Sequence, residues 1–328
     1  MDLYGDLAGL YLEFAEHAAG QSPCFEAWAR GVASDPEVLG WLERLPVLKR
    51  QPNLVFAAAR WCGLPAPGAY AGLRDALLGD DETIVATILA RRTQTNEVGR
   101  LATLVPAFAV AARDSGEPLA LVEVGPSAGL CLYPDRYRYR WRGEDGETVL
   151  GVGPDLPCAV AGPVPLPARV PEIAWRAGVD LHPLSVRDDD AMAWLETLVW
   201  PEQEDRRVRL RAAIDLAAAD PPYLLRGNLL DELPALVAEA EAFGRVVVFH
   251  SAVIAYLEPD DRRRFADLMR GLVAADACHW VSNEAPGVLP DVAATGPTPP
   301  ADRTSFVLGL DGQAVAWTHG HGSTLTWL

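Results

Sequence analysis

A buried apolar run that ends in an acid and a glycine-rich turn constrains the fold of this chain more than any other feature. Leu119 to Val124 has the length and continuity of a strand covered on both faces, and Glu123 lies near its end. Gly125, Ser127 and Gly129 follow, and such small residues let backbone amides approach a ligand closely. The stretch predicts a turn that binds a nucleotide cofactor, with a turn that binds no ligand as the alternative.

The spacing of the small residues narrows the choice of cofactor. A dinucleotide fingerprint would place its third glycine at position 130, where this chain has Leu130. The turn instead resembles motif I of the class I S-adenosylmethionine (SAM) methyltransferases, (D/E)xGxGxG, with Glu123, Gly125 and Gly129 matching. Ser127 stands where the middle glycine would be. The resemblance implies that these four residues bind SAM.

Composition and charge exclude several classes of partner. Hydrophobic residues make up 50% of the chain and charged residues 22%, as in ordinary globular proteins. The formal net charge of −17 argues against nucleic acid and anionic membranes, because both are bound by basic surfaces. We find no signal peptide, no transmembrane run and no CxxC pair. We therefore expect a cytoplasmic protein that acts on a small molecule, and leave its oligomeric state open.

The hydrophobic pattern changes near residue 115. Before it, apolar residues recur at three- and four-residue spacing, which predicts helices, the last of them over Glu82 to Ala112 with Pro106 as the place for a kink or break. We expect residues 1–115 to form an all-helical lid or substrate domain. After it, short apolar strands alternate with helices, which predicts a Rossmann-like, seven-stranded methyltransferase-type sheet over residues 116–328. The expected strands span residues 119–124, 177–181, 223–226, 245–250, 278–282, 305–310 and 313–318.

An insertion over about residues 131–173 separates the first two of these strands, because a plain strand-helix-strand step needs fewer residues. Within it, Arg136 to Trp141 alternates arginine with aromatic residues, so a strand would place the two kinds on opposite faces. The acidic net charge favours a half-buried hairpin here over stacking on nucleic acid. Gly151 to Pro171 is rich in Pro, Gly and Val and is expected to be loop-like.

Two polar residues after later strands extend the resemblance to methyltransferases. Gly178-Val179-Asp180 resembles motif II, whose acid accepts hydrogen bonds from both ribose hydroxyls of SAM. Asn228 stands where the family usually has an Asp that meets the adenine amino group. The resemblance implies that Asp180 and Asn228 hold the nucleoside of SAM. It also implies that a helix beginning at Gly129 offers its N-terminal amides to the methionine carboxylate.

Two titratable residues near the ends of later strands are candidates for catalysis. His250 is suited to act as a general base because imidazole titrates near neutral pH, with a histidine held by hydrogen bonds as the alternative. Glu284 places a carboxylate at the same edge of the sheet, where open α/β sheets bind their ligands. His319 and His321 lie among glycines with no third ligand nearby, so we expect no metal site.

A polar segment interrupts the apolar pattern of the last predicted helix. Arg92, Asn96 and Arg100 recur at four-residue spacing, with Glu97 close by, and would share one helix face. Facing the sheet edge, they would supply donors to an anionic substrate, and facing water they would form weak ion pairs. Because Asn and its Thr and Gln neighbours fill helix surfaces poorly, we favour binding of an anionic substrate.

Several segments together resemble the bacterial DUF2332 family: Thr95–Arg100, Glu123–Leu130, Asp135–Tyr137, Gly178–Pro183, Val199–Gln203 and His250–Ser251. The resemblance covers most of the chain and implies that the helical part and the sheet domain belong together. Our interpretation of the sequence is a SAM-dependent methyltransferase acting on a small, anionic molecule. Ser127 and Asn228 favour an alternative, an enzyme of another reaction type on the same scaffold. A non-catalytic binding protein is the third hypothesis.

Overall fold

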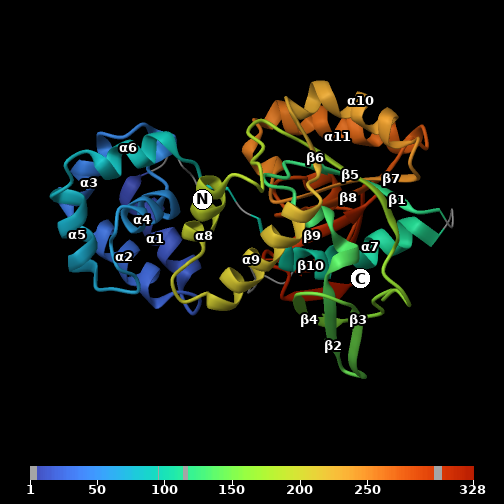
Figure 1. The fold of residues 1–328 in the computed structure, drawn as a ribbon, viewed down its shortest axis with the longest axis horizontal. Helices are drawn as coiled ribbons and strands as arrows, with labels where there is room; N and C mark the ends of the chain where they lie inside the picture. Colours follow the sequence, from blue (N-terminus) through green and yellow to red (C-terminus); the bar gives the residue numbers. More distant parts are fainter. Residues whose placement is uncertain (1–5, 95, 114–116, 299–304) are drawn as a thin grey trace. The chain divides into compact units, whose positions relative to one another are not determined.

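The computed structural model describes residues 6–94, 96–113, 117–298 and 305–328, and most of their helices and strands are labelled in Figure 1. The described residues form two compact units, one from residues 1–95 and 188–211, the other from residues 96–187 and 212–328. The first unit is helical and the second contains the sheet. This division differs from the expected boundary at residue 115, and Thr95 and residues 114–116 lie outside the described part.

The helical unit owes its core to aromatic side chains at helical spacing. Its helices are α1 (Leu7–Ala18), α2 (Pro23–Ala33), α3 (Pro36–Glu43), α4 (Pro52–Trp61), α5 (Tyr70–Leu78), α6 (Thr83–Ala90) and α8 (Asp189–Leu198). Ser22 caps α2 by accepting a hydrogen bond from Phe25 N. The Phe25 ring then packs against Phe56 of α4 with centroids 5.1 Å apart, and both side chains are buried. Except for the segment that begins at Glu82, the helices predicted in this part of the chain are therefore present.

The prediction of one helical segment over Glu82 to Ala112 is wrong. The chain leaves α6 at Ala90, and residues 91–94, 96 and 97 are irregular before α7 (Leu101–Arg113) begins in the sheet unit. Lys49 Nζ and Trp194 Nε1 donate to the carbonyl oxygens of Arg91 and Arg92 at 2.6 and 2.8 Å. These tertiary bonds engage carbonyls that a continuous helix would use internally, so Arg92 and Arg100 do not share a helix face.

The sheet unit contains eleven strands in the order β3-β2-β4-β11-β10-β9-β8-β7-β1-β5-β6. Its parallel part consists of β1 (Leu119–Val124), β5 (Ile173–Asp180), β6 (Tyr223–Arg226), β7 (Arg245–Ser251) and β8 (His279–Glu284). The hairpin of β9 (Ser305–Leu310) and β10 (Gln313–His319) adds antiparallel strands beside β8. All seven predicted strands are present, but the sheet is mixed and larger than the seven strands expected.

The insertion supplies three of the additional strands. They are β2 (Arg138–Gly143), β3 (Gly146–Gly151) and β4 (Asp155–Ala161), and β4 pairs in parallel with both β2 and β11 (Thr324–Trp327). Tyr139 and Trp141 are buried, and Trp141 Nε1 donates to Ala102 O at 2.8 Å. The half-buried hairpin is thus confirmed. The loop expected from Gly151 to Pro171 is wrong over β4, because two neighbouring strands satisfy its backbone.

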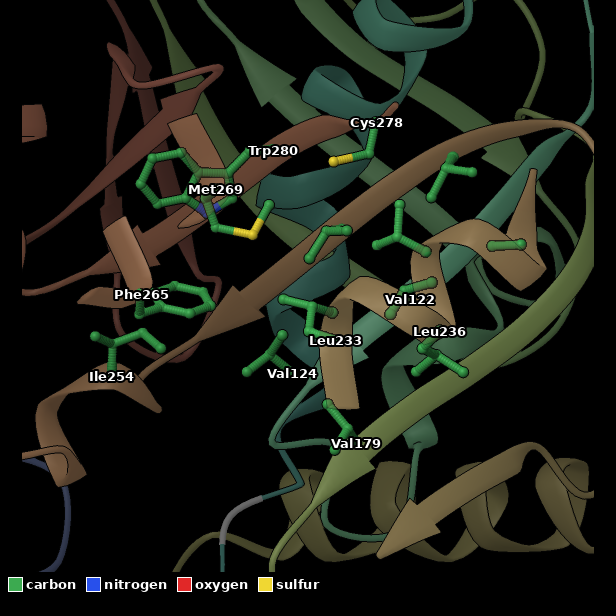
Figure 2. Packing of buried hydrophobic residues seen from close by; sticks show 14 of the residues in the cluster. Val122, Val124, Val179, Leu233, Leu236, Ile254, Phe265, Met269, Cys278 and Trp280 are labelled. Atoms are coloured by element: carbon green, nitrogen blue, oxygen red, sulfur yellow. The ribbon is translucent and has the colours of Figure 1, made fainter. Parts of the chain in front are cut away.

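Helices cover both faces of the parallel strands. On one face, α10 (Leu229–Ala240) and α11 (Pro259–Ala274) pack on β1, β5, β7 and β8, as Figure 2 shows for Leu233, Leu236 and Val122. Successive residues of a strand face opposite sides, so Glu123, between Val122 and Val124, faces the side of α7. The Phe108 ring of α7 lies on that side, 5.1 Å from Phe249.

The remaining helical elements are short or span both units: α9 (Glu204–Ala219), α12 (Pro290–Ala293), and the 3₁₀ helices η1 (Val47–Lys49), η2 (Val98–Arg100), η3 (Leu130–Leu132), η4 (Pro134–Arg136) and η5 (Ile254–Tyr256). None of the helices in the described part is both long and apolar enough to cross a membrane.

Candidate functional site

The turn after β1 is left-handed at all three small residues that the sequence singles out. Gly125, Ser127 and Gly129 have φ angles of +67°, +53° and +71°. A Cβ atom on Gly125 would lie 2.4 Å from Val253 Cγ1, and one on Gly129 would lie 2.7 Å from Pro222 Cγ. Close approach of other chain segments therefore requires both glycines. Ser127 adopts its unfavourable conformation because its neighbours hold it there.

Hydrogen bonds inside the protein engage the amides of this turn. Ser127 N donates to Asp180 Oδ2 at 2.9 Å, and Ala128 N donates to Asn96 Oδ1 at 3.2 Å. Asn96 Nδ2 also donates to Ser127 Oγ at 2.8 Å. The amides of Gly125 and Gly129 donate to backbone carbonyls. The structure thus brings Asn96, Ser127 and Asp180 together, as donors and acceptors to one another.

No α-helix follows the turn, so the helix expected to begin at Gly129 is wrong. The chain forms η3 and η4 and then enters β2. The hydroxyl of Tyr137 donates to Leu130 O at 3.1 Å, and that of Tyr139 donates to Pro134 O at 2.6 Å. These side chains use carbonyls that a helix would bond within itself. The structure therefore offers no α-helix N-terminus at Gly129, only the start of the short 3₁₀ helix η3.

Asn228, the other predicted nucleoside-binding residue, caps a helix. Its side-chain oxygen accepts a hydrogen bond from Leu230 N at 3.0 Å, at the beginning of α10. An Asn in this position satisfies one of the free amides of the first helical turn. The carbonyl that was expected to meet adenine is therefore engaged in the cap.

His250 and Glu284 form a buried pair between the ends of β7 and β8. His250 Nδ1 lies 2.7 Å from Glu284 Oε1, and Trp280 Nε1 donates to His250 Nε2 at 3.0 Å. Because the indole can only donate, Nε2 accepts, and the neutral ring carries its proton on Nδ1. Both ring nitrogens are thus engaged. The arrangement makes His250 a residue that orients Glu284, in agreement with the alternative considered for it.

The two carboxyl oxygens of Glu284 have unequal surroundings. Oε1 accepts from His250 and from the amides of Val253 and Ile254, the latter two at 3.0 and 3.1 Å. Oε2 is buried and has no hydrogen-bond partner among the described residues. Only 2% of Glu284 is exposed. A buried oxygen without a partner is costly, so Oε2 is available to a ligand that donates a hydrogen bond.

Arg100 connects the end of β7 to the turn after β10. Its Nη1 donates to Ser251 O and its Nε donates to Gly320 O, both at 2.8 Å. The same turn packs on the backbone beside Arg100, because a Cβ on Gly322 would lie 2.1 Å from Gly99 O. Arg100 is 7% exposed. Its guanidinium is consequently a fixed positive charge at the carboxyl edge.

A chain of side-chain hydrogen bonds continues from Ser251 across the sheet. Asn283 Nδ2 donates to Ser251 Oγ at 2.9 Å, and Thr318 Oγ1 donates to Asn283 Oδ1 at 2.6 Å. Asn283 and Thr318 are almost completely buried. Sequence reasoning missed Thr318 and Trp280. A polar residue in the strand Gln313–His319 was the available signal for Thr318, whereas nothing local distinguishes Trp280 from an ordinary core residue.

Two further glutamates lie near Arg100. Burial raises the pKa of Glu123 well above its usual range, the charge of Asp180 raises it further, and Arg100 opposes both. Glu123 Oε2 is buried without a partner among the described residues. Glu97 accepts a hydrogen bond from Gly99 N at 3.1 Å, and its Oε2 lies 3.4 Å from His321 Nδ1. Of the residues predicted to bind substrate, Asn96, Glu97 and Arg100 thus belong to the sheet unit.

Arg92 is the exception, because it is exposed and belongs to the helical unit. Within the described residues, no three His, Cys, Asp or Glu side chains are grouped so that they could hold a metal ion. The candidate site is therefore the carboxyl edge of β1, β7 and β8. We call its seven polar residues the carboxyl-edge cluster: Glu97, Arg100, Glu123, Ser251, Asn283, Glu284 and His321.

The fold is that of an α/β protein with a mixed sheet, in which five parallel strands form one end of the sheet and a buried polar cluster lies at their carboxyl edge. The chain belongs to the DUF2332 family, described as "Uncharacterized protein conserved in bacteria", whose family model matches residues 8–327. The family resemblance seen in the sequence is thereby confirmed. Comparison with curated proteins and with solved structures gave no match.

Proposed function

We propose that this chain is an enzyme that removes a proton from a small molecule at the carboxyl edge of β7 and β8, with Glu284 as general base. The observation that carries the proposal is the unequal carboxylate of Glu284, one oxygen bound by three donors and the other buried without a partner. A general base needs such a fixed direction, because proton transfer requires hydrogen-bond distance and alignment. His250 is then a positioning residue.

The surroundings of Glu284 support this assignment. Ala252 directly precedes Val253 and Ile254, whose amides bind Glu284, and it has a φ of +57°. Non-glycine residues held in that conformation cluster at functional sites. Desolvation raises the pKa of Tyr256, and the charges of Arg100 and Glu284 shift it in opposite directions. The proposed site thus combines a base, a fixed cation and a phenol on neighbouring segments. The carboxyl ends of the five parallel strands lie along this edge, where ligands of open α/β sheets bind.

The test measures turnover and works with a mixture of substrates. Purified protein is incubated with a bacterial metabolite extract, and depleted and newly formed compounds are followed by mass spectrometry. We expect Glu284→Gln to slow the reaction by about 100-fold or more, the usual contribution of a general base. Glu284→Asp should retain part of the activity, since it keeps a carboxylate on a shorter side chain.

Asp311→Asn is the matched control. Asp311 lies at the opposite end of β8, where it accepts from Trp280 N at 2.7 Å and contacts His279 Nδ1 at 2.8 Å. It therefore forms a second carboxylate–histidine pair away from the site, and its removal changes the net charge by the same amount. Turnover that persists in Glu284→Gln, or a wild-type protein that changes no metabolite, would contradict the proposal.

A SAM-dependent methyltransferase acting on a small molecule is the second candidate, and the strand order favours it. Numbered along the chain, the five parallel strands lie in the order 3-2-1-4-5, the order of doubly wound nucleotide-binding sheets. Asp180 lies beside the turn of Ser127, where a carboxylate could accept hydrogen bonds from a ribose. The turn is less suited to the methionine carboxylate of SAM, because the amides of Gly125, Ser127, Ala128 and Gly129 already donate to groups of the protein.

Calorimetry with SAM and S-adenosylhomocysteine decides between the two candidates. If SAM is the cofactor, both compounds bind to the wild-type protein, and Asp180→Ala weakens binding by about tenfold, the effect of losing a charge-assisted hydrogen bond. Absence of binding at millimolar concentration in folded protein removes the methyltransferase candidate and leaves the first proposal standing.

A further inference from the structure

The buried polar atoms that lack a partner at the carboxyl edge are acceptors. Among the described residues of the carboxyl-edge cluster, Glu284 Oε2 and Glu123 Oε2 are in this state. Most of the donors nearby are engaged, since Arg100 gives Nε and Nη1 to backbone carbonyls and Asn283 Nδ2 binds Ser251 Oγ. A ligand that completes the site must therefore donate hydrogen bonds.

The charges of the cluster favour a cationic donor over a neutral one. Arg100 is the common neighbour, because its charge acts on Glu123 and on Tyr256, and Glu284 acts on Tyr256 as well. Beside this single guanidinium, the cluster holds the carboxyl groups of Glu97, Glu123 and Glu284, of which Glu97 caps the 3₁₀ helix that carries Arg100. The carboxyl groups therefore outnumber the positive charge. The net charge of −17 adds to the attraction of a small cation.

We propose that the substrate of this site carries an ammonium group, which donates a hydrogen bond to Glu284 Oε2. The inference rests on the proposed function and specifies its substrate class. Transfer of one ammonium proton to Oε2 leaves a neutral amine with its lone pair on nitrogen and a protonated carboxyl on Glu284. The same oxygen thus binds the cation and then takes its proton, so recognition and base catalysis depend on one atom.

The site offers few hydrogen-bond donors to an anionic substrate, the class that we favoured from the sequence. Asn96 donates to Ser127, two of the three guanidinium nitrogens of Arg100 are bonded to carbonyls, and Arg92 belongs to the other unit. An anion at Glu284 Oε2 would also face a carboxylate oxygen across a short distance, which is repulsive in a buried place.

The experiment compares two small molecules of similar length and opposite charge. Binding of 1,4-diaminobutane and of succinate to the full chain is measured by calorimetry at neutral pH. We expect the diamine to bind and succinate not to bind. Glu284→Gln should weaken diamine binding by about tenfold or more, because a charge-assisted hydrogen bond is lost. Asp311→Asn, which removes one negative charge at the other end of β8, should leave binding unchanged.

Three results would overturn the inference. They are succinate binding as tightly as the diamine, no diamine binding at millimolar concentration, and diamine binding equally weakened by Glu284→Gln and Asp311→Asn, which would indicate general attraction to an acidic surface. If Glu284→Gln fails to fold, Glu284→Asp provides the second variant: its shorter side chain withdraws the carboxylate from the position of Oε2 and should also weaken binding of the diamine. Metabolite turnover tests the proposed function separately, because the loss of turnover expected in Glu284→Gln does not depend on either probe.

Discussion

Replacing Gly322 by Ala tests how the turn after β10 is held against the segment that carries Arg100. Gly322 has a φ of +77°, and its Cβ would lie 2.1 Å from the carbonyl oxygen and 2.3 Å from the carbonyl carbon of Gly99. The left-handed conformation alone costs an alanine about 1–2 kcal/mol. Forcing the two backbones apart adds about 1–3 kcal/mol, since neither atom belongs to a flexible side chain.

Gly312→Ala supplies the control for the conformational part of this cost. Gly312 has a φ of +80°, nearly that of Gly322, but its Cβ would meet nothing closer than a Trp280 ring atom at 4.0 Å. Urea unfolding, followed by tryptophan fluorescence, should give Gly312→Ala a free energy of unfolding about 1–2 kcal/mol below that of the wild-type protein. Gly322→Ala should lie lower still. Equal free energies of unfolding for the two variants would refute the close packing of the two backbones.

Three further predictions concern the same unit. Asn96→Ala removes two hydrogen bonds to the turn after β1, so it should cost about 1–3 kcal/mol and accelerate hydrogen exchange at the Ala128 amide; unchanged exchange would contradict this role. Burial and the charge of Asp180 raise the pKa of Glu123, so the native state holds its proton to higher pH than the unfolded chain and stability falls as pH rises. Glu123→Gln should therefore gain stability relative to wild type between about pH 4 and 7 by more than about 1 kcal/mol, and equal pH profiles in urea unfolding would argue against it. Hydrogen bonds from Arg138 and Arg140 lower the pKa of Asp155 to about 2, so Asp155→Asn should cost less than about 1 kcal/mol at neutral pH, and the difference should vanish as pH falls towards 2; a constant difference would count against the ion pairs.

Strand positions could be predicted from the sequence because the apolar runs that define them are local. The bounds expected for β1, Leu119 to Val124, are those of the structure. The sequence did not predict β11, since four residues near glycines carry little hydrophobic pattern, and its order depends on pairing with both β10 and β4. The loop expected at β4 was wrong for the same reason. A local hydrophobic pattern carries no information about which distant strands pair.

For the site, the sequence likewise indicates positions but not the partners of each side chain. Glu123, Asp180, His250 and Glu284 could be found because each is a polar residue near the carboxyl end of a predicted strand. Their chemical surroundings could not, because these depend on partners distant in sequence. The bond from Trp280 to His250 Nε2, for example, gives the histidine a positioning role that no spacing rule implies.

The parallel pairing of β4 with β11 also determines when the sheet can be completed. Strand β4 has β2 on one side and β11 on the other, so the hairpin of β2 and β3 reaches the rest of the sheet only through β11. During synthesis, the hairpin emerges long before Thr324–Trp327. The hairpin can already pack on α7, which precedes it in the chain and accepts the hydrogen bond of Trp141, but the side of β4 that pairs with β11 stays open until Thr324–Trp327 has been made. Such late, distant pairing is slow, so completion of the sheet should be a late step in folding.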